Sequence, residues 1–407
     1  MRILSLSWSN LYKPRDGTAL VTYNRWKRLG HRHQVTMLIA NSKSEPVDPG
    51  IEPPENYTER LITIPTVPQS FFLRFDRTIR RRLPWISSQT GMQVNREAKY
   101  RVAEELATGK YDIVQVEPFY LFWTLPEKVD IPIAFSCNDV ASRFVMDQLR
   151  AAKTPWDKFW FARQYALMRK LECKNWKRAS VIFAFTELEA NLIRKDVPNA
   201  NIVVAANGVD IDFIKPMGTP VIPNEIVFVG VLDGSANVDA ITWYGRNAFP
   251  IVQKQVPEAK LKIVGRNPIP EVLALQENSG IEVVGEVPDV RPYLDQAQVV
   301  ISPVRLGAGM KGKTVEAMAM KKPLVSTTFA AEGVKYTPDV NILLADTPEE
   351  MAAQTVRILK DPALAQRLGE NGRKLVEELY SWDAIVDQLD AAYYEIVKQK
   401  GAATTRS

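Results

Sequence analysis

A loop rich in glycine and lysine carries the clearest chemical signal in the sequence. Residues 307–314 read GAGMKGKT; they follow the apolar run Val299–Val304 and lead into the helical pattern VEAMAM. The loop satisfies G-x-x-x-x-G-K-[ST], a pattern typical of phosphate-binding loops. Its glycines admit a ligand closely, and backbone N–H groups at a helix N-terminus attract anions. Lys311 and Lys313 add positive charge, so the loop is predicted to bind a diphosphate.

Two classes of protein use such a loop. A magnesium-dependent nucleotide hydrolase would pair Thr314 with a distant carboxylate, and residues 342–346 (ILLAD) have the form of an apolar strand that ends in one, Asp346. However, only two strands are expected after the loop, and the segment DTPEE from Asp346 also fits an ordinary helix N-cap. The second class binds the diphosphate of a sugar nucleotide. The loop pattern alone leaves both classes open.

Composition limits the alternatives. The chain has 407 residues, enough for two α/β domains, and its 46% hydrophobic and 24% charged residues are ordinary for a globular protein. A net charge of +5 is too small to indicate a nucleic-acid partner, but it suits anionic ligands or an anionic membrane face. Cys137 and Cys173 have no ligand-like spacing, so we expect no structural zinc and a cytoplasmic location. No apolar stretch approaches the ~20 residues of a spanning helix.

The elements that must position the loop alternate along the whole chain. Apolar runs of strand length are separated by helical patterns, which favours parallel sheets covered by helices on both faces. We expect strands at 3–7, 34–39, 62–65, 113–117, 133–136 and 181–185, and then at 226–229, 260–264, 281–284, 299–302, 323–326 and 341–344. We expect helices at about 18–29, 92–107, 141–150, 156–178 and 187–194, and then at 237–254, 270–278, 290–296, 312–320, 348–360, 362–378 and 382–397.

These two sets of repeats predict two domains. The first spans 1–205, a linker rich in proline and glycine spans 206–223, and the second domain spans 224–382. A last helix at about 383–398 precedes a frayed tail at 399–407. Open α/β domains bind ligands at the carboxyl ends of their strands, so a ligand is expected in a cleft between them.

A series of short motifs in the second half resembles one enzyme family. In order along the chain stand VAANGVD (204–210), FVG (228–230), LKIVG (261–265), VVGEVPD (283–289), PVRLGAG (303–309), KTVEAMA (313–319), KPLV (322–325), AEG (331–333) and YSW (380–382). Together they resemble the retaining GT-B glycosyltransferases of family 4, in particular the polysaccharide-biosynthesis type. The first half resembles them less, through PRDG (14–17) and GHRHQV (30–35). The resemblance implies two Rossmann-like domains whose parallel sheets face each other across a cleft, with the last helix packed back on the first domain.

The resemblance also implies an activity and roles for particular residues. A sugar would pass from a nucleoside-diphosphate sugar to a glycan or lipid-linked acceptor with retention of configuration, and no further cofactor would be required. Glu316 would accept hydrogen bonds from the ribose hydroxyls of the donor, and the loops at Arg266 and Val287 would line the base pocket. The donor's diphosphate would be held, and its developing charge stabilised, by Gly307, Ala308, Gly309, Lys311, Lys313 and Thr314.

Two departures from the family pattern open an alternative function. Ala308 stands eight residues before Glu316, where the family usually has a glutamate that contacts the donor sugar. The family also has an Arg/Lys pair after the first strand of this domain, whereas segment 231–240 contains no cation. Arg305, Lys311 or Glu332 would have to supply the missing contact, and Lys311 and Lys313 the missing charge. Otherwise the protein is a catalytically silent protein that binds a sugar nucleotide or a glycan.

Several residues outside the loop have two interpretations each. Gly17, before the first helix, lets a ligand approach that helix end, and in the family this loop faces the donor phosphate and the acceptor. Asp139 either orients the acceptor hydroxyl or caps the helix from Ser142. Asp210 and Asp212 imitate a metal site, but a turn explains them more simply, so no metal site is predicted. The histidines, His31 and His33, are interpreted as a surface turn.

One basic, aromatic stretch stands apart. Residues Phe71–Trp85 contain five arginines and one acid, and residues 156–161 (WDKFWF) add a second aromatic cluster. Such segments dock on anionic lipid, with aromatic rings at the interface and arginines on the headgroups. An anionic membrane surface would suit a lipid-linked acceptor and a peripheral location. The alternative is an insertion that packs on the first domain.

Overall fold

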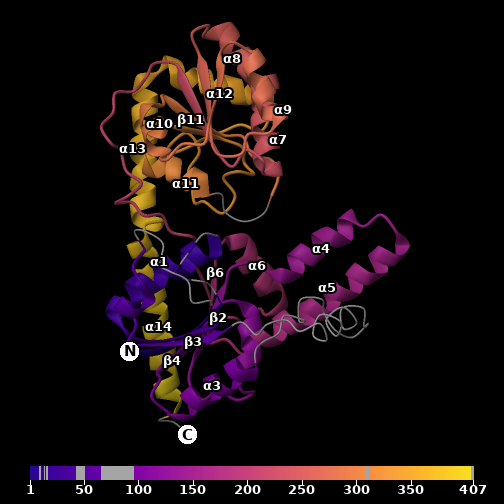
Figure 1. The fold of residues 1–407 in the computed structure, drawn as a ribbon, viewed down its shortest axis with the longest axis vertical. Coiled ribbons are helices and arrows are strands. Elements are labelled where there is room, and N and C mark those ends of the chain that lie inside the picture. Colours follow the sequence, from indigo (N-terminus) through magenta and orange to yellow (C-terminus); the bar gives the residue numbers. More distant parts are fainter. Residues whose placement is uncertain are drawn as a thin grey trace. The chain divides into compact units, whose positions relative to one another are not determined.

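Short apolar runs form two parallel sheets, one in each half of the chain (Figure 1). The computed structural model describes residues 1–8, 11–12, 14, 17–42, 51–65, 96–307 and 312–404. Within them the chain divides into two compact units, residues 1–205 with 386–407, and residues 206–385. Both units are α/β domains with parallel sheets, as the sequence predicts.

In the first domain the described strands follow the order β3-β2-β1-β4-β5-β6-β7. β1 lies inside the sheet and pairs with β2 and β4, and its Ile3, Leu4 and Leu6 are fully buried because helices cover both faces of a parallel sheet. The strands are β1 (Arg2–Ser7), β2 (Gln34–Ser42), β3 (Arg60–Pro65), β4 (Ile113–Val116), β5 (Ile133–Cys137), β6 (Val181–Ala184) and β7 (Ile202–Val204). The helices are α1 (Gly17–Arg32), α3 (Arg96–Ala107), α4 (Ala141–Ala151), α5 (Pro155–Trp176) and α6 (Glu187–Asp196), with 3₁₀ turns η1 (Pro54–Asn56) and η2 (Phe119–Thr124).

In the second domain the described strands follow the order β10-β9-β8-β11-β12-β13. They are β8 (Glu225–Val229), β9 (Lys260–Val264), β10 (Ile281–Gly285), β11 (Val299–Ser302), β12 (Leu324–Ser326) and β13 (Leu343–Leu344). The helices are α7 (Ser235–Trp243), α8 (Phe249–Gln255), α9 (Pro270–Leu273), α10 (Arg291–Gln296), α11 (Gly312–Ala319), α12 (Pro348–Lys360), α13 (Pro362–Leu379) and α14 (Trp382–Thr404). Two further short elements are the π turn η3 (Tyr244–Ala248) and the 3₁₀ turn η4 (Ala274–Glu277).

Three elements differ in detail from the sequence expectations. The helix expected at 237–254 is present as one continuous helical run, but the π turn η3 separates α7 from α8, because Pro250 has no N–H for the helix ladder. The strand β7 was missed because it is only three residues long and partly exposed. The tail expected from 399 is helical as far as Thr404, since Gln399, Lys400 and Ala402 all favour helix.

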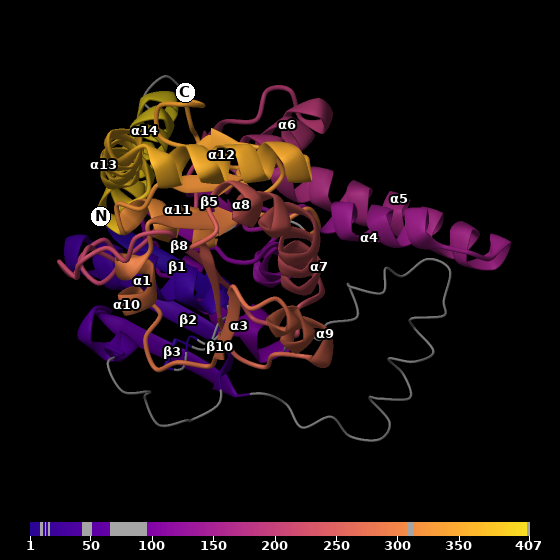
Figure 2. The same ribbon diagram turned by 90° about the horizontal axis from the view of Figure 1, so that it is seen from above.

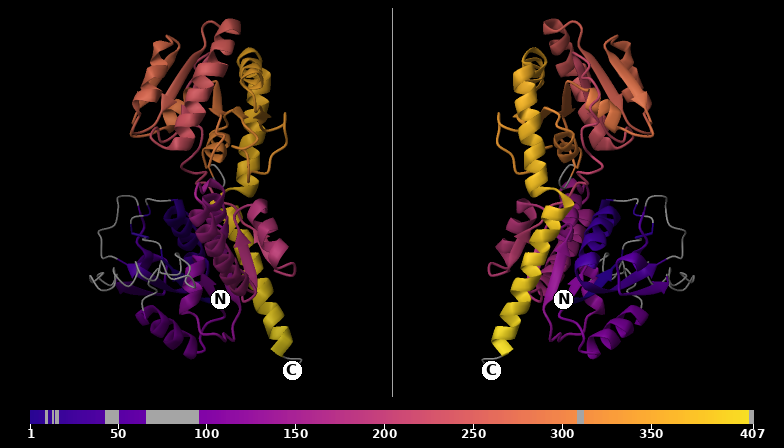
Figure 3. Two further views of the ribbon diagram at one scale, coloured as in Figure 1. Left: turned by 90° about the vertical axis from the view of Figure 1, so that its right-hand side faces the viewer. Right: turned by 90° about the vertical axis from the view of Figure 1, so that its left-hand side faces the viewer.

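The last helix belongs mostly to the first domain. α14 lies against the first sheet, where it appears in yellow in Figure 3. Tyr393 of α14 donates a hydrogen bond to Gln115 Oε1 at 2.9 Å, and its ring meets Phe183 edge-on. His33 is buried and hydrogen-bonded to Asp390, also of α14. The interpretation of His33 as part of a surface turn is therefore wrong, because α14 covers it.

Candidate functional site

The candidate phosphate loop lies where the strand order of the second sheet reverses. β8 and β11 are neighbours at the middle of this sheet, and the chain leaves them towards opposite sides. α7 follows β8, and α11 follows β11. Because all the strands are parallel, both helices begin at the same edge of the sheet. Ligands of open α/β sheets bind at this kind of switch point.

The side chain of Lys313, in the first turn of α11, reaches the neighbouring helix α7. Its Nζ donates a hydrogen bond to Asn237 Oδ1 of α7 at 2.5 Å, and it lies 4.8 Å from the centre of the Phe228 ring. Asn237 is itself held, since its Nδ2 donates to the carbonyl of Val231 at 2.9 Å. The ammonium of Lys313 is thus placed beside the N-termini of α7 and α11, where an anion is favoured.

Glu316 lies one turn further into α11. It lines a small cavity with Lys313, Val229 and Ser302. Burial raises the pKa of the Glu316 carboxyl, and the positive charge of Lys313 opposes that rise. A Cβ built on Gly312 would lie 3.9 Å from Glu316 Oε1, so the carboxylate folds back towards the start of the helix. A carboxylate and an ammonium therefore stand together at one helix end.

A second cation reaches the same helix, α7. Arg305 donates two hydrogen bonds to Asp239, at 2.8 and 3.2 Å, and stacks 4.7 Å over the ring of Trp243. Sequence reasoning missed Asn237 and Asp239, because the search in segment 231–240 was for cations. The available signal was a pair of polar side chains in the first turns of the helix after β8.

Three more of the predicted donor-binding residues, Gly307, Arg266 and Val287, follow strands of the second sheet at the same edge. Gly307 has φ 112°, a conformation that favours glycine. Arg266 is exposed after β9, and its carbonyl accepts a hydrogen bond from Leu232 N at 2.8 Å. Val287 is half-buried after β10. Ala308, Gly309 and Lys311 lie outside the described residues.

Thr314 does not face a ligand as the sequence analysis expected. Its side chain is 0% exposed, and its hydroxyl donates to the carbonyl of Ala330 at 3.1 Å. It points into the domain because it lies on the inner side of α11, so only its backbone N–H remains a candidate for phosphate.

The hydrolase interpretation fails for the same reason and for a second one. Asp346 follows β13, which is separated from β11 by β12. Thr314 lies on α11, which follows β11, so the two residues leave the sheet from strands that are not neighbours. Instead, the Asp346 carboxylate accepts hydrogen bonds from the N–H and hydroxyl of Thr328, at 2.8 and 2.7 Å. Thr347 caps α12, as the N-cap interpretation predicts.

Two candidate residues belong to the first domain. Gly17 begins α1, the helix that follows β1. Asp139 is exposed after β5 and does not cap α4, because the N–H of Ser142 donates instead to Glu172 Oε1 of α5 at 3.2 Å. The capping alternative for Asp139 is therefore wrong. The segment Phe71–Trp85 lies outside the described residues.

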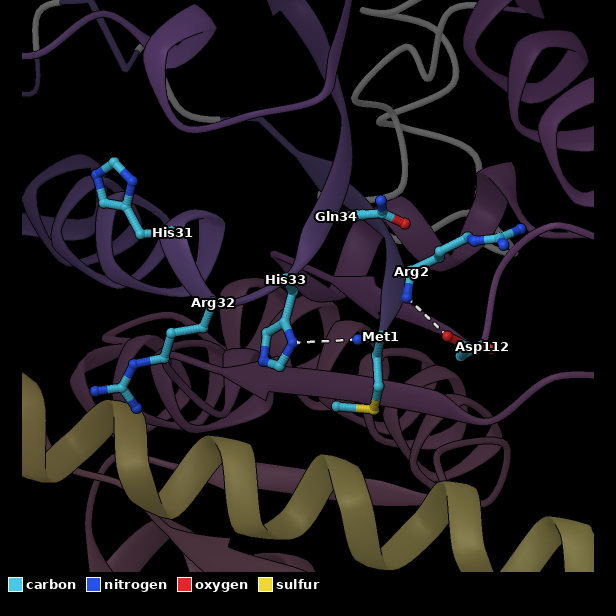
Figure 4. A pocket seen from close by; sticks show the side chains of 7 residues that line it. All are labelled: Met1, Arg2, His31, Arg32, His33, Gln34 and Asp112. Atoms are coloured by element: carbon cyan, nitrogen blue, oxygen red, sulfur yellow. Dashed lines mark hydrogen bonds between the residues drawn. The ribbon is translucent and has the colours of Figure 1, made fainter.

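A cavity of about 460 Å³ lies at the opposite, amino-terminal edge of the first sheet (Figure 4). Its polar groups are largely paired within the protein. Arg32 binds Asp387 at 2.6 Å and Asp390 at 3.2 Å, and the backbone N–H of Arg2 donates to Asp112 at 2.7 Å. We infer that the Arg32 ion pairs hold α14 rather than a ligand.

The aspartates that imitate a metal site form an ordinary turn. Asp210 Oδ1 accepts the N–H groups of Asp212 and Phe213, at 3.1 and 3.0 Å, which is the turn that the sequence analysis favoured. The described residues contain no group of three or more His, Cys, Asp or Glu side chains arranged to hold a metal ion. Every helix in the described part of the chain is too short or too polar to cross a membrane.

Comparison with known protein families gives a match within the second domain. Residues 223–361 match the model of the family described as Glycosyl transferases group 1. The second domain matches a glycosyltransferase family. The capsular polysaccharide biosynthesis glycosyltransferase CapM of Staphylococcus aureus is 25% identical over 160 residues, which are 37% of this chain and 42% of CapM. The chain spans less than half the length of the curated relatives that it matches.

Solved structures resemble the whole chain. Sucrose-phosphate synthase from Thermosynechococcus elongatus has a TM-score of 0.66 and 16% identity over 98% of this chain and 100% of that chain. HepE from Anabaena, solved in complex with UDP, has a TM-score of 0.63 and 15% identity over 97% of this chain and 100% of that chain. The fold is that of the GT-B glycosyltransferases.

Proposed function

We propose that this protein is a glycosyltransferase that moves a sugar from a nucleoside-diphosphate sugar to a glycan or lipid-linked acceptor. The observation that carries the proposal is the placement of Lys313 and Glu316 together at the start of α11, at the switch point of the second sheet. The match of residues 223–361 to a glycosyltransferase family supports it. HepE, whose structure is similar, was solved in complex with UDP, so UDP is the first nucleotide to test.

The proposed chemistry rests on charge at this helix end. As the bond between sugar and diphosphate breaks, negative charge grows on the leaving phosphate oxygens. The Lys313 ammonium and the N–H groups of α7 and α11 would stabilise that charge without a metal ion. Glu316 would accept hydrogen bonds from the two ribose hydroxyls of the donor, since a carboxylate offers one oxygen to each hydroxyl. Retention of configuration, as in family 4, is part of the proposal and is checked by the anomeric NMR signal of the product.

The acceptor and the location are also part of the proposal. CapM, whose name places it in capsular polysaccharide biosynthesis, matches part of the chain, so we propose a polysaccharide precursor as acceptor. Both cysteines, Cys137 and Cys173, are free thiols, which suits a cytoplasmic protein at the membrane's inner face.

The test is thermal unfolding with UDP, GDP, ADP and ATP, each with magnesium and with EDTA. A ligand of the native state raises the melting temperature by mass action. We expect UDP or GDP to raise it in EDTA, and Lys313→Ala to remove most of the rise and to slow transfer about 100-fold. Lys254→Ala changes an exposed lysine of the same domain and should leave both unchanged. Stabilisation by none of the diphosphates would contradict the proposal.

Binding without transfer is the second candidate, and one observation favours it. Both cations described at the site have partners on α7, Lys313 with Asn237 and Arg305 with Asp239. Their charge is therefore partly satisfied before a donor arrives. A measurement of sugar release from the donor, with and without an acceptor, distinguishes a transferase from a protein that only binds the donor. Stabilisation by UDP with no turnover would favour the silent protein.

A further inference from the structure

A helical hairpin of the first domain projects away from its sheet. α4 and α5 run side by side and extend beyond the other elements of this domain (Figures 1 and 2). The base is firmly attached. Glu172 of α5 accepts the N–H of Ser142 at the start of α4, and Arg169 forms an ion pair with Asp196 of α6. The tip of the hairpin, at residues 150–160, lies at the end away from the sheet.

Large aromatic side chains are exposed on the hairpin. Trp156 is 71% exposed, and Phe159 and Phe144 are each 60% exposed. The rings of Trp156 and Phe159 lie 6.1 Å apart, so they form one patch at the start of α5. The exposed Ala162 and Ala166 continue the patch along α5 at helical spacing. An apolar stripe of this kind marks an interaction surface.

The hairpin also carries an excess of positive charge. Residues 141–178 contain ten Lys or Arg and three Asp or Glu, whereas the whole chain carries a net charge of only +5. Near the tip, Arg150 is paired with Asp147 at 3.6 Å, and Asp157 takes part in the cap of α5 with Thr154. The exposed Lys153 and Lys158 have no ion-pair partner among the described residues.

We propose that the tip of the α4–α5 hairpin docks on an anionic lipid bilayer. Trp156 and Phe159 would enter the interfacial layer, where aromatic rings are favoured, and Lys153 and Lys158 would lie on anionic headgroups. A second copy of the chain is a poorer occupant, because a symmetric contact would bring two basic tips together. Docking requires neither donor nor transfer, so the proposal stands or falls independently of the proposed function.

The experiment measures co-sedimentation of the full chain with vesicles, without any nucleotide. We expect binding to vesicles that contain phosphatidylglycerol, and at least tenfold weaker binding to pure phosphatidylcholine. The double variant Lys153→Glu/Lys158→Glu should weaken binding to the anionic vesicles at least tenfold, and Trp156→Ser/Phe159→Ser at least fivefold.

Matched controls lie elsewhere in the same domain. Trp123 is half exposed and Lys110 is exposed, both outside the hairpin, so Trp123→Ser and Lys110→Glu should bind as the unchanged chain does. An unchanged melting temperature shows that each variant folds. Equal binding of all variants, or equal binding to both kinds of vesicle, would overturn the proposal. So would a concentration-dependent dimer that only the hairpin variants lose, because it would assign the surface to a second copy.

Discussion

At the scale of single residues, the position of Lys313 depends on its neighbours. A lysine side chain has a flexible four-carbon stem and loses much rotamer freedom when it is held in one place. Here Asn237 accepts a hydrogen bond from its ammonium, and the face of Phe228 lies under it. Both neighbours come from β8 and α7, not from the loop that carries Lys313. Asn237 is therefore a positioning residue for the proposed transfer.

Asn237→Ala tests this role. Without the side-chain acceptor, the Lys313 ammonium is no longer fixed, and we expect kcat to fall about tenfold while KM for the donor changes less. Asn237→Asp keeps an acceptor oxygen at the same place and should recover part of kcat. Asn247→Ala is the control, because Asn247 is exposed and bonds only the Trp243 carbonyl of its own helix. Equal rates for Asn237→Ala and Asn247→Ala would exclude a positioning role.

Glu189 gives a prediction about pH. Burial, with a contribution from the charge of Asp139, raises the pKa of Glu189 to about 7. The folded protein then holds this proton more tightly than the unfolded chain does, so stability is lost as pH rises from about 4.5 to about 7. In Glu189→Gln this loss should disappear, while the capping box with Thr186 is kept.

Melting temperatures from pH 4.5 to 8 measure the effect. The unchanged chain should lose more stability over this range than Glu189→Gln does, by at most about 3 kcal/mol. Glu187→Gln, an exposed acid on the same helix, should follow the unchanged chain. Parallel curves for the unchanged chain and Glu189→Gln would show that folding does not raise the pKa of Glu189.

At the scale of elements, α13 supports α11 from behind. Arg373 of α13 donates to the Ala319 carbonyl at the end of α11 at 2.8 Å. Gly369 lies so close to the following turn that a Cβ there would be 2.1 Å from the Lys321 carbonyl oxygen. The missing side chain is therefore what allows α13 to approach α11, the helix that carries Lys313 and Glu316.

Gly369→Ala should consequently destabilise the second domain by about 2–4 kcal/mol, although alanine is the better helix former. A backbone carbonyl cannot move aside, so the two helices must separate. Gly401→Ala is the matched control, because a Cβ there meets nothing within 4 Å in α14. Its stability should be unchanged or slightly higher. Calorimetry of both variants measures the change in stability. An equal change in the two variants would show that α13 tolerates a side chain at position 369.

At the scale of the whole molecule, the chain passes from one unit to the other at Ala205–Ala206 and returns inside α14, at Ile385–Val386. The segments next to these points lie side by side. Val209 N donates to the Tyr380 carbonyl at 2.7 Å, and a Cβ on Gly208 would be 2.5 Å from the Trp382 ring. The first domain is therefore completed by the C-terminal residues of the chain, from Val386 onwards.

A chain that ends at Ile385 tests this dependence. It lacks four large buried side chains of α14: Val386, Leu389, Tyr393 and Ile396. Each is worth about 1.5–3 kcal/mol of burial, a large part of the stability of one domain. We expect calorimetry to show the transition of the second domain near its original temperature and the first domain unfolded. Two unchanged transitions would mean that α14 adds little to the first domain.

Much of this molecule was predictable because its signals are local. Apolar runs indicated nearly every strand, and the cap at Thr347 and the turn at Asp210 followed from their residue types. The errors came where a distant group intervened. Glu172, from another helix, caps α4 in place of Asp139, and α14 buries His33.

The sequence by itself determined that both halves are parallel α/β domains and that a cationic loop opens a helix after the apolar strand that ends at Ser302. Periodicity and loop chemistry are properties of neighbouring residues, so spacing reveals them. Only the tertiary structure decided that β8 lies beside β11, and hence that Asn237 reaches Lys313 across 76 residues of chain. It also decided that the hydroxyl of Thr314 is buried and bonds the Ala330 carbonyl. The physical reason is that a side chain's partners are set by strand order and packing, which spacing along the chain does not specify.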